Sequence, residues 1–98
     1  MSNTIDVLCV GGPANGRVVN MPRPGTTYIE FPLIVDGGGL ATYTRRTWED
    51  ELTGKLYHVA TRDEDAVTDE QVIIEIVLAL FNPAWDLNPP YTQMALPA

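Results

Sequence analysis

Short runs of apolar and alternating residues divide the first two thirds of the chain into five predicted strands. They cover residues 5–10, 17–21, 26–35, 40–48 and 55–61. These runs are rich in β-branched or aromatic residues and are bounded by glycine, proline or polar turn residues, a pattern typical of strands. Because Pro32 cannot donate a hydrogen bond to a neighbouring strand, the third strand is expected at a sheet edge or at a bulge.

A different pattern follows residue 67. Thr68 is suited to be an N-cap and Gln71 stands three positions later, which is the spacing of a capping box. Apolar side chains then cover most of the circumference of a helix predicted to run from about 68 to 82, where Asn82 and Pro83 end it. A helix that is apolar nearly all round must be covered on more than one side.

Strands followed by one helix predict an α+β fold. We expect an antiparallel sheet of four or five strands, built from hairpins, with the C-terminal helix packed on one face; this single domain covers residues 1–82. The predicted core takes apolar positions from every element except the fourth strand: Val7, Cys9, Val18, Ile29, Phe31, Leu33, Tyr57, Val59, Ile73, Ile76, Val77 and Leu80.

Residues 83–98 form a proline-rich C-terminal tail. Four prolines exclude a regular helix or a central strand from it. Its apolar anchors are Trp85, Leu87, Tyr91, Met94 and Leu96. Two interpretations stay open: the tail packs on the helix of its own chain, or it packs on a neighbouring subunit. In either case Trp85, Leu87, Tyr91 and Met94 are candidate interaction residues.

The charge balance bears on the choice of partner. Thirteen acidic residues against six basic ones give a formal net charge of −7. Such a surface repels nucleic acid and anionic membranes, so neither is expected as a direct partner. Two acidic stretches, Glu49-Asp50-Glu51 and Asp63-Glu64-Asp65, read as solvated loop charge or as residues that dock on a basic protein surface.

Residues that could carry chemistry are few. The loop at 11–16 (GGPANG) lacks the Lys-Ser/Thr ending of a phosphate loop and does not enter a helix, so it predicts a hairpin turn. A single cysteine excludes an intrachain disulfide, and one cysteine with one histidine excludes a zinc site within one chain unless carboxylates alone hold the metal. No catalytic, cofactor-binding or metal-binding residue is therefore assigned. A small enzyme that uses His58 with Asp63 or Glu64 is a minor alternative.

The expected setting is intracellular. No apolar run reaches the roughly 18 residues of a membrane-spanning helix. The N-terminal residues MSNTID also lack the positive charge of a signal peptide.

Three segments together resemble small uncharacterised proteins encoded by tailed bacteriophages and prophages: CVGGPANGRVV, then YTRRTW with KLYHVA, and the capped helix. The likeness covers about residues 7–81 and implies a phage product in the bacterial cytoplasm or in the virion; it assigns no catalytic residue. The expected function is a non-enzymatic protein–protein interaction module, in one version an inhibitor of a host protein. The alternative is a minor virion component or a self-assembling oligomer.

Overall fold

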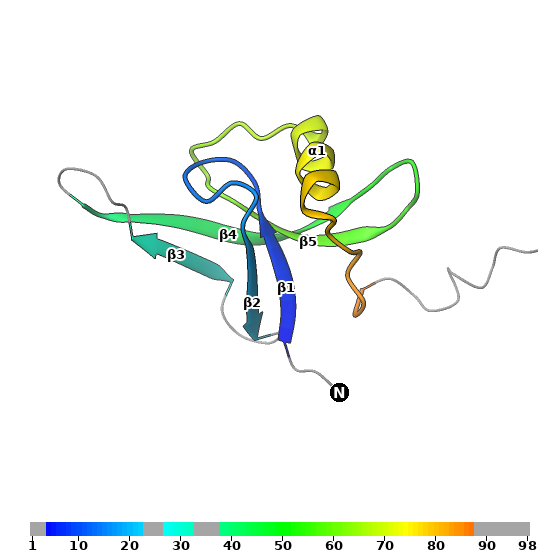
Figure 1. The fold of residues 1–98 in the computed structure, drawn as a ribbon, viewed down its shortest axis with the longest axis horizontal. Coiled ribbons are helices and arrows are strands. Elements are labelled where there is room, and N and C mark those ends of the chain that lie inside the picture. The colour runs from blue at the N-terminus through cyan, green and yellow to red at the C-terminus, as the bar shows by residue number, and fades with distance from the viewer. Residues whose placement is uncertain (1–3, 23–26, 33–37, 88–98) are drawn as a thin grey trace, which may run out of the picture.

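The computed structural model describes residues 4–22, 27–32 and 38–87. In that part of the chain it contains five strands and one helix (Figure 1). Their bounds are β1 Thr4–Cys9, β2 Val18–Pro22, β3 Tyr28–Pro32, β4 Leu40–Glu49, β5 Leu56–Thr61 and α1 Asp69–Ala79. The predicted α+β fold with a single C-terminal helix is confirmed.

The five strands form one sheet in the order β2-β1-β5-β4-β3. Three neighbouring pairs are antiparallel, as expected from hairpins. The fourth pair is different: β1 and β5 run parallel, with Leu8 opposite Val59 and Cys9 opposite Ala60. The prediction of an antiparallel sheet is therefore wrong for this pair. The reason is that β1 and β5 are not consecutive, so no turn between them could indicate their relative direction.

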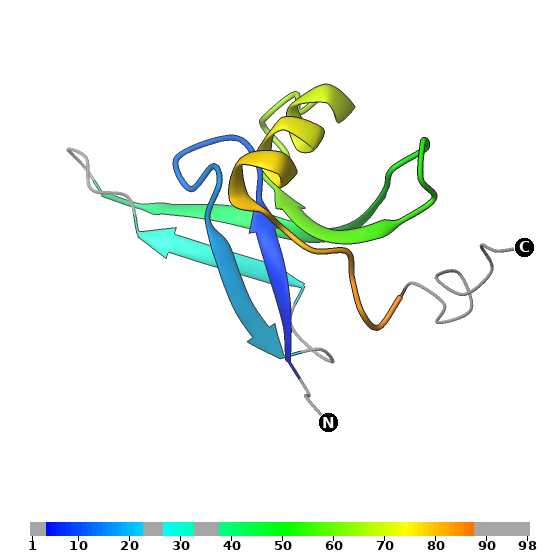
Figure 2. The ribbon, with the colours of Figure 1, turned by 45° about the vertical axis from the view of Figure 1, so that its right-hand side comes forward.

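The sheet is strongly twisted, and the β1–β2 hairpin runs across the β3–β4 ribbon rather than along it (Figures 1 and 2). Because successive side chains of a strand point to opposite faces, β1 contributes to two core clusters. Val7 and Cys9 lie in one cluster with Tyr43. Leu8 and Val10 lie in the other, beneath the helix. Burial on both faces accounts for the nearly continuous apolar run of β1.

The N-terminal end of α1 follows the sequence pattern. The Thr68 side chain accepts a hydrogen bond from the Gln71 backbone N–H at 3.2 Å. Trp48 of β4 donates its indole N–H to Asp69 at 2.9 Å, which ties the first turn to the sheet.

The C-terminal end of α1 comes earlier than predicted. The helix ends at Ala79, and Leu80 adopts a left-handed conformation with φ 51°. The N–H of Phe81 then donates to the carbonyl of Ile76 at 2.9 Å, which closes the helix before Asn82 and Pro83 are reached.

The face of α1 that packs on the sheet also differs from the prediction. Val72 is buried, and Ile76 and Ala79 pack against the same cluster. Ile73, Val77 and Leu80, predicted to be core residues, are exposed, and so is Val18 on β2. Five predicted core residues are confirmed as buried: Val7, Cys9, Ile29, Tyr57 and Val59. Phe31 and Ile76 are half-buried, and Leu33 lies outside the described residues.

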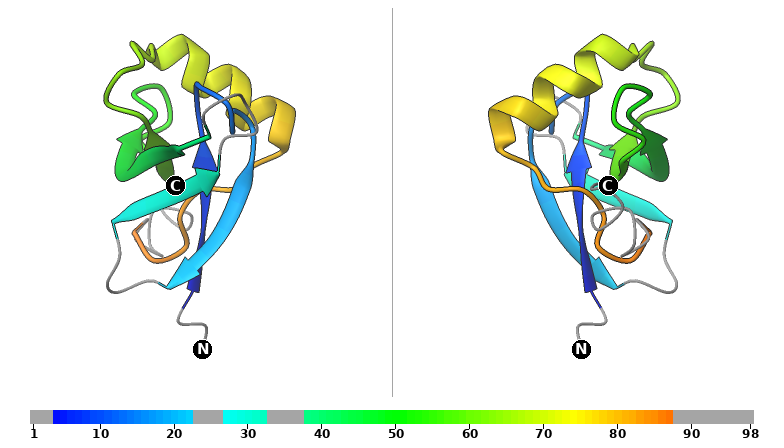
Figure 3. Two further views of the ribbon diagram at one scale, coloured as in Figure 1. Left: turned by 90° about the vertical axis from the view of Figure 1, so that its left-hand side faces the viewer. Right: turned by 90° about the vertical axis from the view of Figure 1, so that its right-hand side faces the viewer.

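After the helix, the chain returns along the sheet (Figure 3). Ala84 is buried and donates its N–H to the carbonyl of Leu56 at 2.7 Å. The first residues of the predicted tail thus pack against β5 of their own chain; those after Leu87 lie outside the described residues.

Candidate functional site

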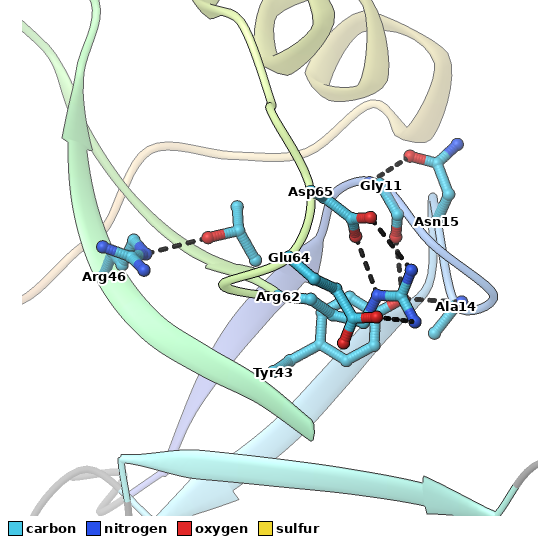
Figure 4. A network of polar contacts seen from close by, with 9 residues as sticks. Gly11, Ala14, Asn15, Tyr43, Arg46, Arg62, Glu64 and Asp65 are labelled. Atoms are coloured by element: carbon cyan, nitrogen blue, oxygen red, sulfur yellow. Dashed lines mark hydrogen bonds and ion pairs between the residues drawn. The ribbon is translucent and has the colours of Figure 1, made fainter. Parts of the chain in front are cut away.

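The loop at residues 11–16 is held closed by a tyrosine. The hydroxyl of Tyr43, on β4, accepts a hydrogen bond from the Ala14 N–H at 2.8 Å and donates one to the Gly11 carbonyl at 2.7 Å (Figure 4). The Gly11 N–H donates to the Asn15 side chain at 2.7 Å. These polar groups are satisfied within the chain, so the loop is a hairpin turn and not an anion cradle, as the sequence predicts.

An arginine clasp covers the same loop. Arg62 donates two hydrogen bonds to Asp65, at 2.8 and 2.9 Å. The guanidinium holds the pKa of Asp65 below its usual value, and the pair raises that of Arg62. A Cβ atom on Gly12 would lie 2.6 Å from Arg62 Nε and 2.7 Å from the Tyr43 hydroxyl, so only glycine has room there.

The two acidic stretches lie at opposite ends of the β4–β5 hairpin. Glu49 stands opposite Leu56 at the turn, whereas Thr44 stands opposite Thr61, just before the second stretch. Five residues of strand, about 17 Å, separate these two register positions. The stretches therefore do not form one acidic surface.

Each acidic stretch also has local partners. Asp50 caps the turn by accepting the Leu52 N–H at 3.0 Å. Asp63 pairs with Arg46 at 3.0 Å, and Glu64 lies 3.8 Å from Arg62. With Asp65 also paired, the second stretch is largely neutralised by the chain's own arginines; Glu49 and Glu51 remain exposed at the turn.

The single histidine has a partner that the sequence did not indicate. His58 Nε2 lies 2.8 Å from Asp86 Oδ1, and the two side chains are only 10% and 6% exposed. The minor alternative paired His58 with Asp63 or Glu64; the structure pairs it with Asp86 instead. This contact fastens residues 84–87 to β5, together with the hydrogen bond of Ala84.

The structure places the thiol of Cys9 and the imidazole of His58 in different surroundings. Cys9 is fully buried, and desolvation raises the pKa of its thiol to about 11. His58 borders an open hollow of about 500 Å³ between the β1–β2 hairpin and the segment after α1. Neither serine nor cysteine lines that hollow in the described residues. No described group of three or more His, Cys, Asp or Glu could hold a metal ion.

The apolar anchors of the tail are only partly placed. Trp85 is 54% exposed and Leu87 is half-buried. Tyr91 and Met94 lie outside the described residues.

The helix α1 carries a group of exposed aliphatic side chains. Four aliphatic side chains point away from the sheet, Ile73, Ile74, Val77 and Leu78, with exposed fractions of 40%, 49%, 63% and 73%. We call these four the α1 outer face. Exposed Leu80 and Trp85 follow them beyond the helix. A contiguous exposed apolar patch often marks a surface at which another molecule binds.

Across the described ranges, no helix is both long and apolar enough to cross a membrane. Comparison with protein-family models, curated proteins and solved structures gives no match.

Proposed function

We propose that this chain is a non-enzymatic protein–protein interaction module that works through the α1 outer face. The exposure of Ile73, Ile74, Val77 and Leu78 carries the proposal. A surface helix normally presents polar residues to water. Beyond Glu70 in the first turn, the side of α1 away from the sheet carries these four aliphatic side chains, and burying them against a partner would remove that surface from water.

The resemblance to phage-encoded proteins supports a phage origin, and with it a place in the bacterial cytoplasm or the virion. In that setting an interaction module can act as an inhibitor by occupying a surface of a host protein. The acidic stretches give this version little support, because they lie apart and one is paired with Arg46 and Arg62.

The test uses a matched pair of surface variants. The full chain and the double variant Ile74→Glu/Leu78→Glu are tagged and used to capture proteins from a bacterial lysate. Both positions are exposed, and glutamate is a good helix former, so the variant should fold. The control is Leu52→Glu, which places the same charge on a 91% exposed leucine in the β4–β5 turn.

A stoichiometric partner, or further copies of the chain itself, should bind the wild type and the Leu52 variant but not the helix variant. Capture that is equal for all three proteins would rule out the α1 outer face as the working surface.

A self-assembling oligomer or minor virion component is the second candidate. The aliphatic side chains of the α1 outer face favour it, because homodimer interfaces are more apolar than other protein–protein interfaces.

A further inference from the structure

The open hollow between the β1–β2 hairpin and the segment after α1 combines polar and apolar walls. Its volume of about 500 Å³ lies within the range of roughly 300–1,000 Å³ that is usual for ligand pockets. Asp6 and Asn20, on the hairpin, lie on its polar side. Val18, Leu80 and Trp85 give it an apolar rim, and these residues are 44%, 85% and 54% exposed. A ligand can therefore reach both kinds of surface from solvent.

Asp6 gives the hollow its charge. Its carboxylate accepts a hydrogen bond from the Asn20 side-chain amide at 2.9 Å, and the register places the two residues opposite each other. Within the described ranges no lysine or arginine lines the hollow, and no ion pair joins Asp6 to a basic residue. His58, which also lines the hollow, is already paired with Asp86.

This setting differs from that of the acidic loop residues after β5. Asp63 and Asp65 pair with arginines of their own chain. The carboxylate of Asp6 is instead fixed in place by an amide, beside an apolar rim, without a counter-charge from the described chain. It is thus complementary to a cation that another molecule supplies.

The apolar rim narrows the choice of cation. A cationic head would be attracted to Asp6 while an aliphatic stem covers Val18 and Leu80, and long basic side chains combine these two parts. Arginine suits the hollow better than lysine. Its guanidinium presents five donors in one plane and stacks on aromatic rings such as that of Trp85, whereas an ammonium group is compact and strongly hydrated.

We propose that this hollow binds an arginine side chain presented by a basic peptide segment of a partner protein. The formal net charge of −7 supports such a partner, because it attracts basic molecules at long range. Residues 83–98 of the chain contain neither lysine nor arginine, so the C-terminal tail does not supply the cation. The hollow shares no residue with the α1 outer face, and the proposal therefore goes beyond the proposed function and does not depend on it.

A nuclear magnetic resonance titration of the ¹⁵N-labelled full-length protein tests the proposal. The probe is a blocked peptide with one arginine between glycines, and the matched control carries citrulline, the neutral isostere of arginine. The arginine peptide should shift the Trp85 indole and Asn20 side-chain amide signals saturably. The indole signal of Trp48, which is bonded to Asp69 beside the helix, should stay in place.

The controls on the ligand side use the wild-type protein, so they do not depend on the folding of a variant. The citrulline peptide should bind at least about tenfold more weakly, because it cannot form charge-assisted hydrogen bonds with Asp6. A lysine peptide should also bind more weakly than the arginine peptide. Absence of shifts at Trp85 and Asn20, or equal affinity for all three peptides, overturns the proposal.

A matched pair of variants tests the role of the carboxylate. Asp6→Asn removes the charge and keeps a hydrogen-bonding group beside Asn20, and it should weaken binding of the arginine peptide at least about tenfold. Asp63→Asn makes the same change at a side chain that is 84% exposed and pairs with Arg46, and it should bind like the wild type. An Asp6 variant with unchanged affinity overturns the proposal.

The helix variant Ile74→Glu/Leu78→Glu keeps the two proposals distinguishable. Neither position lines the hollow, so this variant should bind the arginine peptide like the wild type even where it loses a lysate partner. Peptide binding that is lost in the helix variant and kept in Asp6→Asn would overturn the placement of the arginine site in the hollow.

Discussion

The loop at residues 11–16 and the α1 outer face differ in whether the chain itself supplies partners for their exposed groups. The loop carries polar backbone groups that could bind a ligand, and the protein uses them itself through Tyr43 and Asn15. The helix carries apolar side chains that could form a core, and the described chain leaves them in contact with water. A closed feature of this kind explains the fold, whereas an open one points to function.

The largest expected loss of stability comes from removing the Tyr43 hydroxyl, which holds the loop at residues 11–16 closed. Tyr43→Phe keeps the ring but leaves the N–H of buried Ala14 and the carbonyl of Gly11 without their partner. Each unsatisfied group costs about 1 to 3 kcal/mol, so the free energy of unfolding should fall by about 3 kcal/mol. Urea unfolding measures it. Tyr57→Phe is the control, because its ring is also buried but its hydroxyl takes no part in the loop contacts. Equal losses for the two variants would contradict the role of the Tyr43 hydroxyl in holding the loop closed.

The next effect compares the two faces of α1 directly. Val72→Ala removes buried methyl groups beneath the helix and should cost about 2 kcal/mol. Leu78→Ala, on the outer face, should change the free energy of unfolding by less than about 0.5 kcal/mol. The measurement is made at a protein concentration too low for association. A large loss at Leu78 in the monomer would mean that the outer face is covered within the chain.

The smallest effect concerns Arg62 and Asp65. Because Arg62 lowers the pKa of Asp65 below 3.8, the folded state favours the carboxylate. The resulting stabilisation is present above pH 3.8 and is lost as the pH falls through the lowered pKa. Urea midpoints followed from neutral pH into this acid range should fall less steeply for Asp65→Asn than for the wild type. Asp63→Asn, at the exposed partner of Arg46, should leave the slope close to that of the wild type.

Local patterns in the sequence predict local structure well. The strands, the glycine turn and the Thr68 cap depend on neighbouring residues, and each is found near its predicted place. The end of α1 was misplaced because a leucine, not a glycine, takes the left-handed position at residue 80. Nothing in a leucine signals that conformation.

Local patterns do not predict contacts between residues that lie far apart in the chain. Tyr43 meets the loop, and His58 meets Asp86, across about thirty residues of chain each. The inward face of α1 was also misassigned, since a helix that is apolar all round has no periodic signal to orient it. That same property, recognised from the sequence, is what leads to the outer face as the candidate site.

The parallel pairing of β1 with β5 has a consequence for how the chain acquires its shape. The hairpins close over short loops, but the β1–β5 pair joins segments about fifty residues apart, such as Leu8 and Val59, and carries the larger entropic cost of closure. The apolar floor on which α1 rests is shared between these two strands, so it is complete only after they meet. We therefore expect slow folding with late helix docking, since non-local pairing limits folding rates. Until that step, a newly synthesised chain would expose both sides of its most apolar segment.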